Sequence, residues 1–380
     1  MGPPLLFTPL PLRGVTIPNR CVLSPMVQHK AHGGQVNDYH LVHLGKFAIG
    51  RFGIVFTENC AVEPRGRTTP GDLGIWDDNQ LDGHRRLVRF IQQQGSLAAI
   101  QISHAGRKAS SPRPFDAPGQ FGPAGAGWQP WDVVGPSALP AGEGDRLPQE
   151  LSIEAIEDLV HRFAAAAERA NRAGYDVIEL HAAHGYLLAQ FLSPISNHRE
   201  DRYGGNLAGR MRFPLDVVRA MRQTMSVDKP LFVRVSALDG AGGWDLTDTV
   251  SFAKELKNLG VDVVDCSSGG LTGLATAQPI QRSPGFQVPF ASAVRQNANI
   301  ATMAVGLILD GPQAEAILQS QHADLIAIAR QALNDPHWLL HAAQALGCDD
   351  DYELWPPEYG WWLNKRKANL PSHLWKSPTY

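Results

Sequence analysis

Short apolar runs recur along the whole chain, and most of them are rich in valine and isoleucine. A run of four to eight residues that stays apolar throughout is typical of a strand buried on both faces. The stretches between these runs carry the longer spacing of amphipathic helices. The pattern predicts eight strands, at Cys21–Ser24, Gly53–Glu58, Leu97–Ser103, Asp176–His181, Leu231–Ser236, Val261–Cys266, Ile300–Val305 and Asp324–Ala329.

The clearest helical segment is SIEAIEDLVHRFAAAAERANRA, which covers residues 152–173. Ser152 can accept a hydrogen bond from a free backbone N–H group of the first helical turn, and Gly174 suits the left-handed position that follows a helix. We therefore predict a helix that begins after Ser152 and ends before Gly174. Further helices are expected at residues 80–94, 209–225, 247–259, 286–297, 312–321 and 335–346.

Eight strands that alternate with helices predict an α/β protein with a (β/α)8 TIM barrel. A doubly wound sheet is the alternative, and it would have a glycine-rich G-x-G-x-x-G turn after its first strand. The turn that follows the first predicted strand is SPMVQH, which contains no glycine. The barrel is therefore the predicted fold, and it is expected to span residues 1–348 as a single domain.

Two segments depart from the regular alternation. Residues 104–150 are rich in proline and glycine and are too long for an ordinary loop, so we expect an insertion over the active-site mouth. Residues 349–380 form a C-terminal tail that holds four of the nine tryptophans. An exposed aromatic tail usually contacts another surface. We therefore expect the tail to join subunits in a homodimer or a homotetramer.

Composition excludes several classes of protein. A net charge of -3 and a pI near 6.5 give no basic surface for nucleic acid or for a membrane, and no run is long and apolar enough to span a bilayer. The opening MGPPLLFTPLPLRG is broken by four prolines and lacks the basic start of a signal peptide. The cysteines lie far apart without a C-x-x-C pair, so we expect no disulfide framework or metal cluster and a cytoplasmic location: Cys21, Cys60, Cys266 and Cys348.

Polar residues stand at the carboxyl ends of several predicted strands, where barrel enzymes carry their chemistry. Arg234, in LFVRVSA, would be costly to bury unless it faces an anion or a polar ligand. Gly306 and Arg330 follow the last two strands, where many barrels bind phosphate. Together with Gln101 they suggest a cofactor with a phosphate and a polar head lying across the barrel mouth, although each residue alone could have a local structural role.

The stretch ELHAAHGYLLAQFLSP carries His181, His184 and Tyr186 at the end of a predicted strand. A metal site is one interpretation, but it needs a third ligand. Glu179 precedes the histidines, and we expect it to point away from them. A structural role for the histidines is another interpretation. We favour a third, in which the two imidazoles hold one substrate oxygen and the tyrosine donates a proton, with no metal.

Four segments resemble the old yellow enzymes, the FMN-dependent ene-reductases. They are SPM at the first strand end, IQISHAGRKA, IELHAAHGYLLAQFLSPISNHREDRYGG and PGFQVPFA. The resemblance covers about nine tenths of the chain, from LFTPLPLRGVTIPNR to ADLIAIARQALNDP, and is closest to the bacterial subclass called thermophilic-like. It implies a barrel that binds FMN non-covalently, with NADPH or NADH as the reductant and a small activated alkene as the substrate.

The resemblance also implies a role for each matching residue. His181 and His184 would bind the carbonyl oxygen of the alkene, flavin N5 would deliver hydride to its β-carbon, and Tyr186 would protonate its α-carbon. Gln101 would bind the pyrimidine edge of the flavin, and Arg234 would face N1 and the C2 oxygen. The remaining implied FMN contacts are Ser24, Pro25, Met26, Val27, Asn59 and Val305, with Gly306, Ala329 and Arg330 around the phosphate.

The chain departs from the subclass at four positions. Val27 replaces a cysteine that contacts flavin and substrate, and His29 replaces a tyrosine that faces the substrate. Tyr359 stands where many relatives send an arginine into the active site of a neighbouring subunit, and Ala329 replaces a glycine. We expect His29 and the tail to reshape the pocket for a larger or more polar substrate, with neutral drift as the alternative.

Two other functions remain open at this point. Flavin amine dehydrogenases and dienoyl-CoA reductases use a similar barrel, but they add an iron–sulfur cluster and further domains, which the cysteine spacing does not support. The other alternative is a flavin-binding partner protein that has lost turnover. His181, His184 and Tyr186 argue against that loss, whereas Val27 leaves it open.

Overall fold

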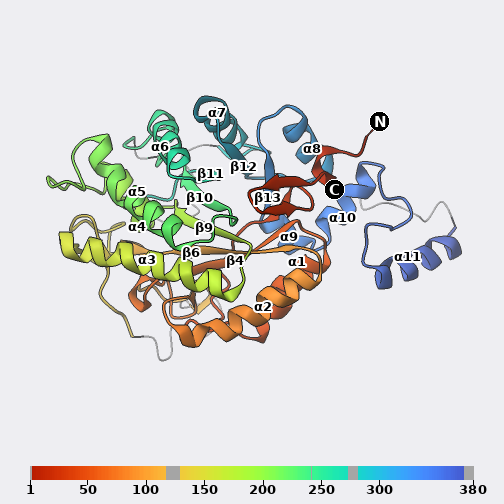
Figure 1. Cartoon of the computed structure of the whole chain (residues 1–380), viewed down its shortest axis with the longest axis horizontal. Coiled ribbons are helices and arrows are strands. Elements are labelled where there is room, and N and C mark those ends of the chain that lie inside the picture. Colours follow the sequence, from red (N-terminus) through yellow and green to blue (C-terminus); the bar gives the residue numbers. More distant parts are fainter. Residues whose placement is uncertain (1, 117–128, 241, 273–280, 372–380) are drawn as a thin grey trace.

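A closed ring of parallel strands forms the centre of the molecule (Figure 1). The computed structural model describes residues 2–116, 129–240, 242–272 and 281–371. Each strand pairs with the next in chain order, and the last returns to the first, which confirms the predicted (β/α)8 barrel and its eight strands. The ring consists of β3 (Cys21–Leu23), β4 (Ile54–Ala61), β6 (Leu97–Ser103), β9 (Val177–Ala182), β10 (Leu231–Ser236), β11 (Val263–Ser267), β12 (Ala301–Val305) and β13 (Leu325–Ile328).

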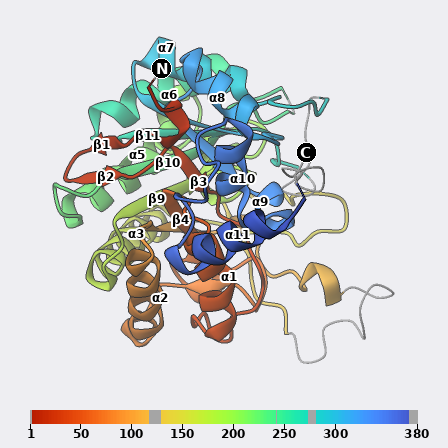
Figure 2. The same cartoon turned by 90° about the vertical axis from the view of Figure 1, so that its right-hand side faces the viewer.

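Helices lie around the outside of this ring (Figures 1 and 2). Every helix that the sequence predicted is present, within a few residues of its expected bounds. The helices are α1 (Asp38–Ile49), α2 (Leu81–Gln93), α3 (Ile153–Ala173), α4 (Leu187–Leu192), α5 (Leu207–Thr224), α6 (Leu246–Asn258), α7 (Val288–Ala298), α8 (Gly311–Gln319), α9 (Arg330–Asn334), α10 (Trp338–Ala345) and α11 (Pro357–Asn369).

The ends of α3 are fixed by the residues that predicted them. The Ser152 side chain accepts a hydrogen bond from the Ala155 backbone N–H at 3.2 Å. Gly174 ends the helix at φ 95°, a left-handed conformation that costs glycine little because it has no Cβ atom. Between these ends the apolar side chains of α3 face the barrel, so local capping and tertiary packing favour the same helix.

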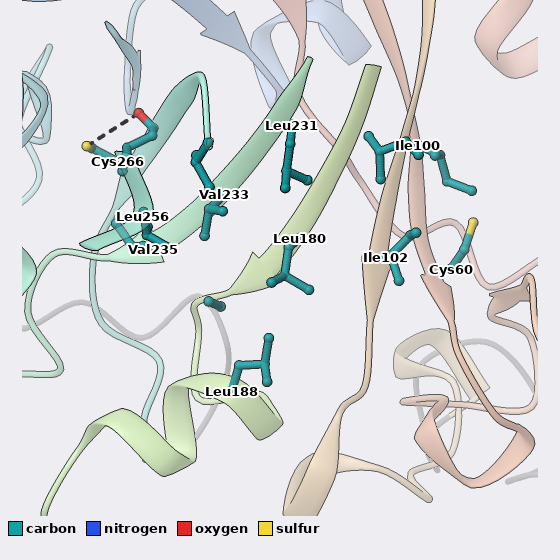
Figure 3. Packing of buried hydrophobic residues seen from close by; sticks show 14 of the residues in the cluster. Cys60, Ile100, Ile102, Leu180, Leu188, Leu231, Val233, Val235, Leu256 and Cys266 are labelled. Carbon is teal, nitrogen blue, oxygen red and sulfur yellow. Dashed lines mark hydrogen bonds between the residues drawn. The ribbon is translucent and has the colours of Figure 1, made fainter. Parts of the chain in front are cut away.

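Alternate residues of each strand serve two different cores. Ile102, Leu180 and Val233 stand side by side in register and point outward, toward the helices (Figure 3). The residues between them point into the ring, where Val177 and Phe232 belong to a separate interior cluster. Burying one such side chain contributes about 1.5–3 kcal/mol. Strands buried on both faces explain why their sequence runs are apolar throughout rather than alternating.

Several elements were absent from the prediction. Helices α1, α4, α9 and α11 were missed, because polar residues, glycine or short length break their apolar spacing. The N-terminal hairpin of β1 and β2 closes one end of the barrel, because its apolar residues pack against the interior cluster. The short elements are β1 (Leu10–Leu12), β2 (Val15–Ile17), β5 (Leu73–Gly74), β7 (Val134–Gly135), β8 (Gln149–Glu150), η1 (Leu5–Phe7), η2 (Pro64–Gly66), η3 (Asp78–Gln80), η4 (Gly106–Lys108) and η5 (Pro114–Asp116).

The expected insertion and tail are described in part. Within residues 104–150, β7 pairs with β8, and residues 117–128 lie outside the described ranges. The tail contains α11, at the edge of the molecule beyond α10 (Figure 1), and residues 372–380 also lie outside those ranges. Among the described helices, none combines the length and apolarity that crossing a bilayer requires.

Candidate active site

The barrel opens at the carboxyl ends of its strands into a cavity of about 460 Å³. Cofactor and small-molecule sites usually occupy about 300–1,000 Å³. The strand ends converge there because all the strands of the ring are parallel. Most of the residues that the sequence predicted for a site line this cavity: Pro25, Met26, Val27, Asn59, Gln101, His181, His184, Tyr186, Arg234, Val305, Gly306, Ala329 and Arg330.

Ser24 and His29 do not line the cavity, although both lie next to it in the chain. The Ser24 hydroxyl accepts a hydrogen bond from Arg234 Nη1 at 2.9 Å, so it supports a cavity residue from behind. His29 Nδ1 lies 2.9 Å from Thr69 Oγ1 and 3.1 Å from Asp72 Oδ1. Its predicted contact with a substrate is therefore not supported by the cavity lining, and its ring is held by the loop before β5.

Tyr359 lies far along the chain from the other site residues, in α11. Its ring packs against His337, with the ring centroids 5.9 Å apart, and the residue is 43% exposed. It does not line the cavity of its own chain. A substrate contact by Tyr359 therefore requires a second subunit, as the resemblance implied.

Other cavity residues were not named as site residues from the sequence. Ser267 ends β11. Phe286 and Gln287 lie in PGFQVPFA, a segment that had been matched to the family without a role for its side chains. The complete set of such residues is Ser267, Arg282, Phe286, Gln287, Leu307, Ile308, Leu309, Ala327, Ile328 and Gln331.

His181 and His184 form a hydrogen-bonded pair at the end of β9. The Ala183 backbone N–H donates to His181 Nδ1 at 3.2 Å, which leaves Nε2 as the protonated nitrogen of a neutral ring. His181 Nε2 lies 3.3 Å from His184 Nδ1, and His184 Nε2 lies 2.8 Å from Ser267 Oγ. A left-handed backbone at His184, with φ 57°, turns its ring toward His181.

The ionisable groups of this stretch are held in their neutral forms. Burial, together with the Arg234 charge, lowers the pKa of His181 and of His184 well below the usual range. Burial and the Asp72 charge raise the pKa of Tyr186 above its usual value. At neutral pH the site therefore presents two neutral imidazoles and a protonated phenol. The ring centroids of His181 and Tyr186 lie 4.9 Å apart.

Lys108 supports the turn that carries His184. Its ammonium group donates to the His184 carbonyl oxygen at 3.1 Å and also to the carbonyl oxygen of Gly270. Burial and the Arg107 charge lower its pKa to about 7. Lys108 lies in the segment HAGRKA, so the resemblance contained it, but no pattern in the sequence indicated that its partners would be backbone carbonyls.

The floor of the cavity consists of two charged or polar pairs. Arg234 Nε lies 3.1 Å from Asp265 Oδ2, although its N–H is not aimed at that oxygen, so the contact is an ion pair without an aligned hydrogen bond. Gln101 Nε2 donates to Glu179 Oε1 at 2.8 Å. The expectation that Glu179 points away from the histidines is wrong. Glu179 and His181 are two residues apart on one strand, and such residues lie on the same face.

A TIM barrel with Gly306 and Arg330 at its last two strand ends and a buried arginine in its mouth has the arrangement expected of a barrel that binds a phosphorylated cofactor. A family model described as "NADH:flavin oxidoreductase / NADH oxidase family" matches residues 5–348. The chain belongs to this family and is of the old yellow enzyme type. It is an oxidoreductase that uses FMN and a nicotinamide co-substrate.

The relatives extend over nearly the whole chain. An NADPH dehydrogenase of Bacillus velezensis is 44% identical over 347 residues, which cover 90% of this chain and 96% of that protein. An NADPH dehydrogenase of Bacillus subtilis strain 168 is 43% identical over 347 residues, which again cover 90% of this chain and 96% of that protein. Morphinone reductase has a similar structure, with a TM-score of 0.75, 26% identity and 90% of each chain covered. A 2-naphthoyl-CoA reductase shares the fold, with a TM-score of 0.80 and 23% identity over 91% of this chain and 53% of that one.

The residues around the cavity fit FMN. Asn59 Nδ2 is buried and has no hydrogen-bond partner within the described chain, as expected of a donor that serves a ligand. An irregularity in the β4–β6 pairing between Phe56 and Asn59 turns this side chain into the mouth. Gly306 has φ 115°, and a Cβ atom there would lie 2.8 Å from Gln287 Nε2, so only glycine keeps this edge of the cavity open. In the described residues no cluster of three metal-ligating side chains occurs.

Proposed function

We propose that this protein is an ene-reductase that reduces the C=C bond of a small activated alkene, such as an α,β-unsaturated carbonyl compound. The observation that carries the proposal is the meeting of three donors in one cavity. His181 Nε2 lies 3.3 Å from His184 Nδ1, and Tyr186 lines the same cavity. Two donor nitrogens this close can bind one carbonyl oxygen and make the β-carbon electrophilic. FMN, when bound and reduced by NADPH or NADH, supplies the hydride for that carbon.

The histidines act as neutral hydrogen-bond donors in this proposal. His181 donates through Nε2–H, because its Nδ1 already accepts from Ala183. His184 donates through Nδ1–H, and its Nε2 then accepts from the Ser267 hydroxyl, 2.8 Å away, which turns its hydrogen from Gln287 Oε1 at 3.4 Å to His184. A substrate oxygen replaces the bond between the two rings. The lowered pKa of both rings supports this role, because neutral imidazoles bind the oxygen without protonating it.

Tyr186 donates the proton to the α-carbon in the proposed reaction. Burial raises the pKa of Tyr186, so its phenol stays protonated at neutral pH and is ready to donate. The other roles are proposed as the resemblance implied them. Arg234 and Gln101 bind the pyrimidine edge of the flavin, while Gly306, Ala329 and Arg330 bind its phosphate.

An anaerobic absorbance titration tests the function. NADPH is expected to bleach the flavin absorption of the purified holoenzyme, and 2-cyclohexenone or N-ethylmaleimide is expected to restore it. Bleaching without recovery would reject simple enones as substrates and would direct attention to the altered pocket at Val27 and His29. A protein that neither carries FMN nor binds it on reconstitution would contradict the proposal at its base.

Replacing Ser267 with alanine is expected to lower kcat/KM for the alkene by about tenfold, the cost of about one hydrogen bond. The variant leaves His184 Nε2 without the hydroxyl that lies 2.8 Å away and fixes the tautomer of the ring. Stopped-flow measurement of flavin reoxidation by 2-cyclohexenone provides the value. Ser268→Ala is the matched control. Both serine hydroxyls lie within hydrogen-bond distance of Gln287 Oε1, so this variant removes such a bond and leaves the Ser267–His184 contact in place. Equal rates in the two variants would argue against the proposed tautomer.

We propose as the alternative that a more polar or larger substrate than a simple enone extends past Val27 to His29, which lies outside the cavity lining. His29 is held by Asp72 and Thr69, so its second ring nitrogen remains as a fixed polar group near Phe115 in the insertion. Val27 offers no hydrogen bond in return. The alternative function is therefore the same FMN chemistry on a different, more polar substrate, of the dehydrogenase or dienoyl reductase type.

Replacing His29 with tyrosine is expected to change substrate preference. We predict that the ratio of kcat/KM between a carboxylate-bearing enone and 2-cyclohexenone falls by about tenfold, because the polar contact is lost while the apolar ring remains. Steady-state turnover of both substrates by the wild-type and His29→Tyr enzymes measures it. An unchanged ratio would mean that the residue at this position has drifted neutrally.

We propose that the tail joins two copies of this chain in a homodimer or homotetramer, while residues 1–348 form the barrel and 104–150 cover its mouth. Trp361 and Trp362 of α11 are 53% and 66% exposed, and exposed aromatic groups of this size favour a protein contact. The three buried cysteines are free thiols, which supports a reducing, cytoplasmic location. Sedimentation of Trp361→Ser/Trp362→Ser against wild type tests the subunit contact.

A further inference from the structure

A small polar cluster lies inside the barrel, directly beneath the cavity. It comprises Gln101 of β6, Glu179 of β9, Arg234 of β10 and Asp265 of β11, which are 2%, 0%, 7% and 0% exposed. Gln101 is in register with Glu179, and Arg234 is in register with Asp265, on strands that are neighbours in the ring. Gln101 and Arg234 also line the cavity above, so each carboxylate stands behind a residue that faces the flavin.

The charges of this cluster do not balance if both carboxylates are ionised. Arg234 is its one cation, against the two acids Glu179 and Asp265. The described interior positions of the other strands are apolar or neutral, such as Phe56, Met303 and others of the interior cluster. A net negative charge in a medium of low dielectric constant costs several kcal/mol, and proteins usually avoid it by protonating one group.

The contacts identify which carboxyl group holds the proton. Asp265 has Arg234 at 3.1 Å, so its negative charge is compensated. Glu179 has no cation within contact distance in the described chain, and its one partner is the neutral amide of Gln101 at 2.8 Å. Its second oxygen, Oε2, is buried without a hydrogen-bond partner, as are both oxygens of Asp265, so the ion pair with Arg234 is what distinguishes Asp265 from Glu179. An ionised carboxylate in that setting would have no water and no cation in contact, and only the more distant charge of Arg234 would act on it.

We propose that Glu179 is a positioning residue that is held as a neutral carboxylic acid beneath the flavin, so that the positive charge of Arg234 is offset by Asp265 alone. With Glu179 neutral the cluster has no net charge and Arg234 can still attract the anionic reduced flavin; with Glu179 ionised the cluster would repel it. The proposal rests on the placement of the flavin's pyrimidine edge over Arg234 and Gln101.

The groups that face Glu179 act in opposite directions on its pKa. Burial and the charge of Asp265 on β11 raise the pKa of Glu179, while Arg234 on β10 and the Gln101 hydrogen bond on β6 lower it by less. His181, on the same strand, is neutral because its own pKa is lowered by burial. The net direction is upward, in agreement with the charge balance.

The sign of the pH effect on stability follows from this direction. In the unfolded chain a glutamate releases its proton near about pH 4.3, whereas folded Glu179 keeps it to a higher pH. Between these two values the folded state binds the additional proton, so its stability falls as the pH rises. Glu179→Gln carries no such proton. Its stability relative to wild type is therefore expected to grow with pH above about pH 4.3, as measured by denaturant unfolding of the FMN-free protein.

Infrared spectroscopy tests the protonation state directly in the FMN-free protein. A carboxylic acid C=O band that shifts in D2O is expected in the wild type at neutral pH and is expected to lose the Glu179 contribution in Glu179→Gln. A contribution from Glu58 remains, because burial raises the pKa of Glu58 as well. Glu63→Gln is the matched control. Burial raises the pKa of Glu63, but hydrogen bonds from His104 and Arg65 outweigh it and lower the pKa to about 2, so this variant should lose a carboxylate band instead. An acid band of the same intensity in Glu179→Gln as in the wild type, or no acid band in the wild type, would overturn the proposal.

The holoenzyme tests the effect on the flavin without any alkene. Two-electron reduction of FMN to its anionic form takes up one proton. Since the new negative charge raises the pKa of Glu179 further, wild type is expected to take up a second proton per two electrons once the pH is high enough to ionise Glu179 in the oxidised enzyme. Glu179→Gln should take up one at every pH at which the reduced flavin is anionic. Electrochemical titrations at several pH values measure this number, and identical curves for the two proteins would refute the role of Glu179 whether or not the enzyme reduces enones.

Discussion

Arg234→Gln is expected to lower the free energy of unfolding of the FMN-free protein by about 3–5 kcal/mol, the usual cost of breaking a buried ion pair on one side. Asp265 is fully buried and lies 3.1 Å from Arg234 Nε, so the substitution leaves its carboxylate without a counter-charge. The hydrogen bond from Arg234 Nη1 to Ser24 is lost as well. Urea unfolding followed by circular dichroism measures the change. FMN affinity is expected to fall by about a hundredfold or more, because a charged hydrogen bond to the cofactor is removed.

The double variant Arg234→Gln/Asp265→Asn separates charge from packing. Both members of the pair are then neutral, and most of the lost stability is expected to return, to within about 1–2 kcal/mol of wild type. FMN affinity is not expected to return with it, because the donor to the flavin is still missing. If the double variant were as unstable as the single one, the charge of Asp265 would not be the cause of the loss.

Tyr186→Phe is expected to slow reoxidation of the reduced flavin by 2-cyclohexenone by about 10²–10⁴-fold, the usual contribution of a general acid. The phenol is the proposed proton donor, its ring packs on His181, and phenylalanine preserves that packing. Bleaching by NADPH is expected to remain at the wild-type rate, because that step needs no proton from Tyr186. Rapid-mixing absorbance at the flavin band measures both steps in one preparation.

Tyr39→Phe is the matched control for this experiment. Its hydroxyl donates to Gln28 at the surface of α1, and the residue is 42% exposed, so neither step is expected to change. Undiminished reoxidation in Tyr186→Phe would mean that the proton comes from solvent or from another group. The ene-reductase proposal would survive that outcome, but the assignment of Tyr186 would not.

The barrel fold could be predicted from the sequence because its strands are buried on both faces. Runs such as LFVRVSA and IELHA stay mostly apolar, so a polar residue near their carboxyl ends already indicates a site. Arg234 and Gln101 were identified in this way. Helices with regular apolar spacing and a capping residue, such as α3, were also predictable from local sequence. By contrast, α4 has only six residues and α9 five, too few to show a period.

Tertiary structure decided what each polar side chain contacts. No pattern in the sequence relates Ser267 to His184, which are 83 residues apart, or Asp265 to Arg234 across two strands. The same holds for Asp72, which fixes His29 from a loop 43 residues away. These partners meet because ring closure brings the carboxyl ends of all the strands to one mouth, and register then sets which side chains face each other.

Glu179 illustrates the boundary between the two kinds of information. Alternation along the backbone places Glu179 on the same strand face as His181, although we expected from the sequence that it would point away. Whether its carboxyl group is charged depends on Asp265, Arg234 and the absence of water around it, all of which come from other strands. The sequence by itself thus determined the fold and the kinds of group at the barrel mouth. Only the tertiary structure decided their protonation and pairing, because electrostatic energies depend on distance and burial rather than on order along the chain.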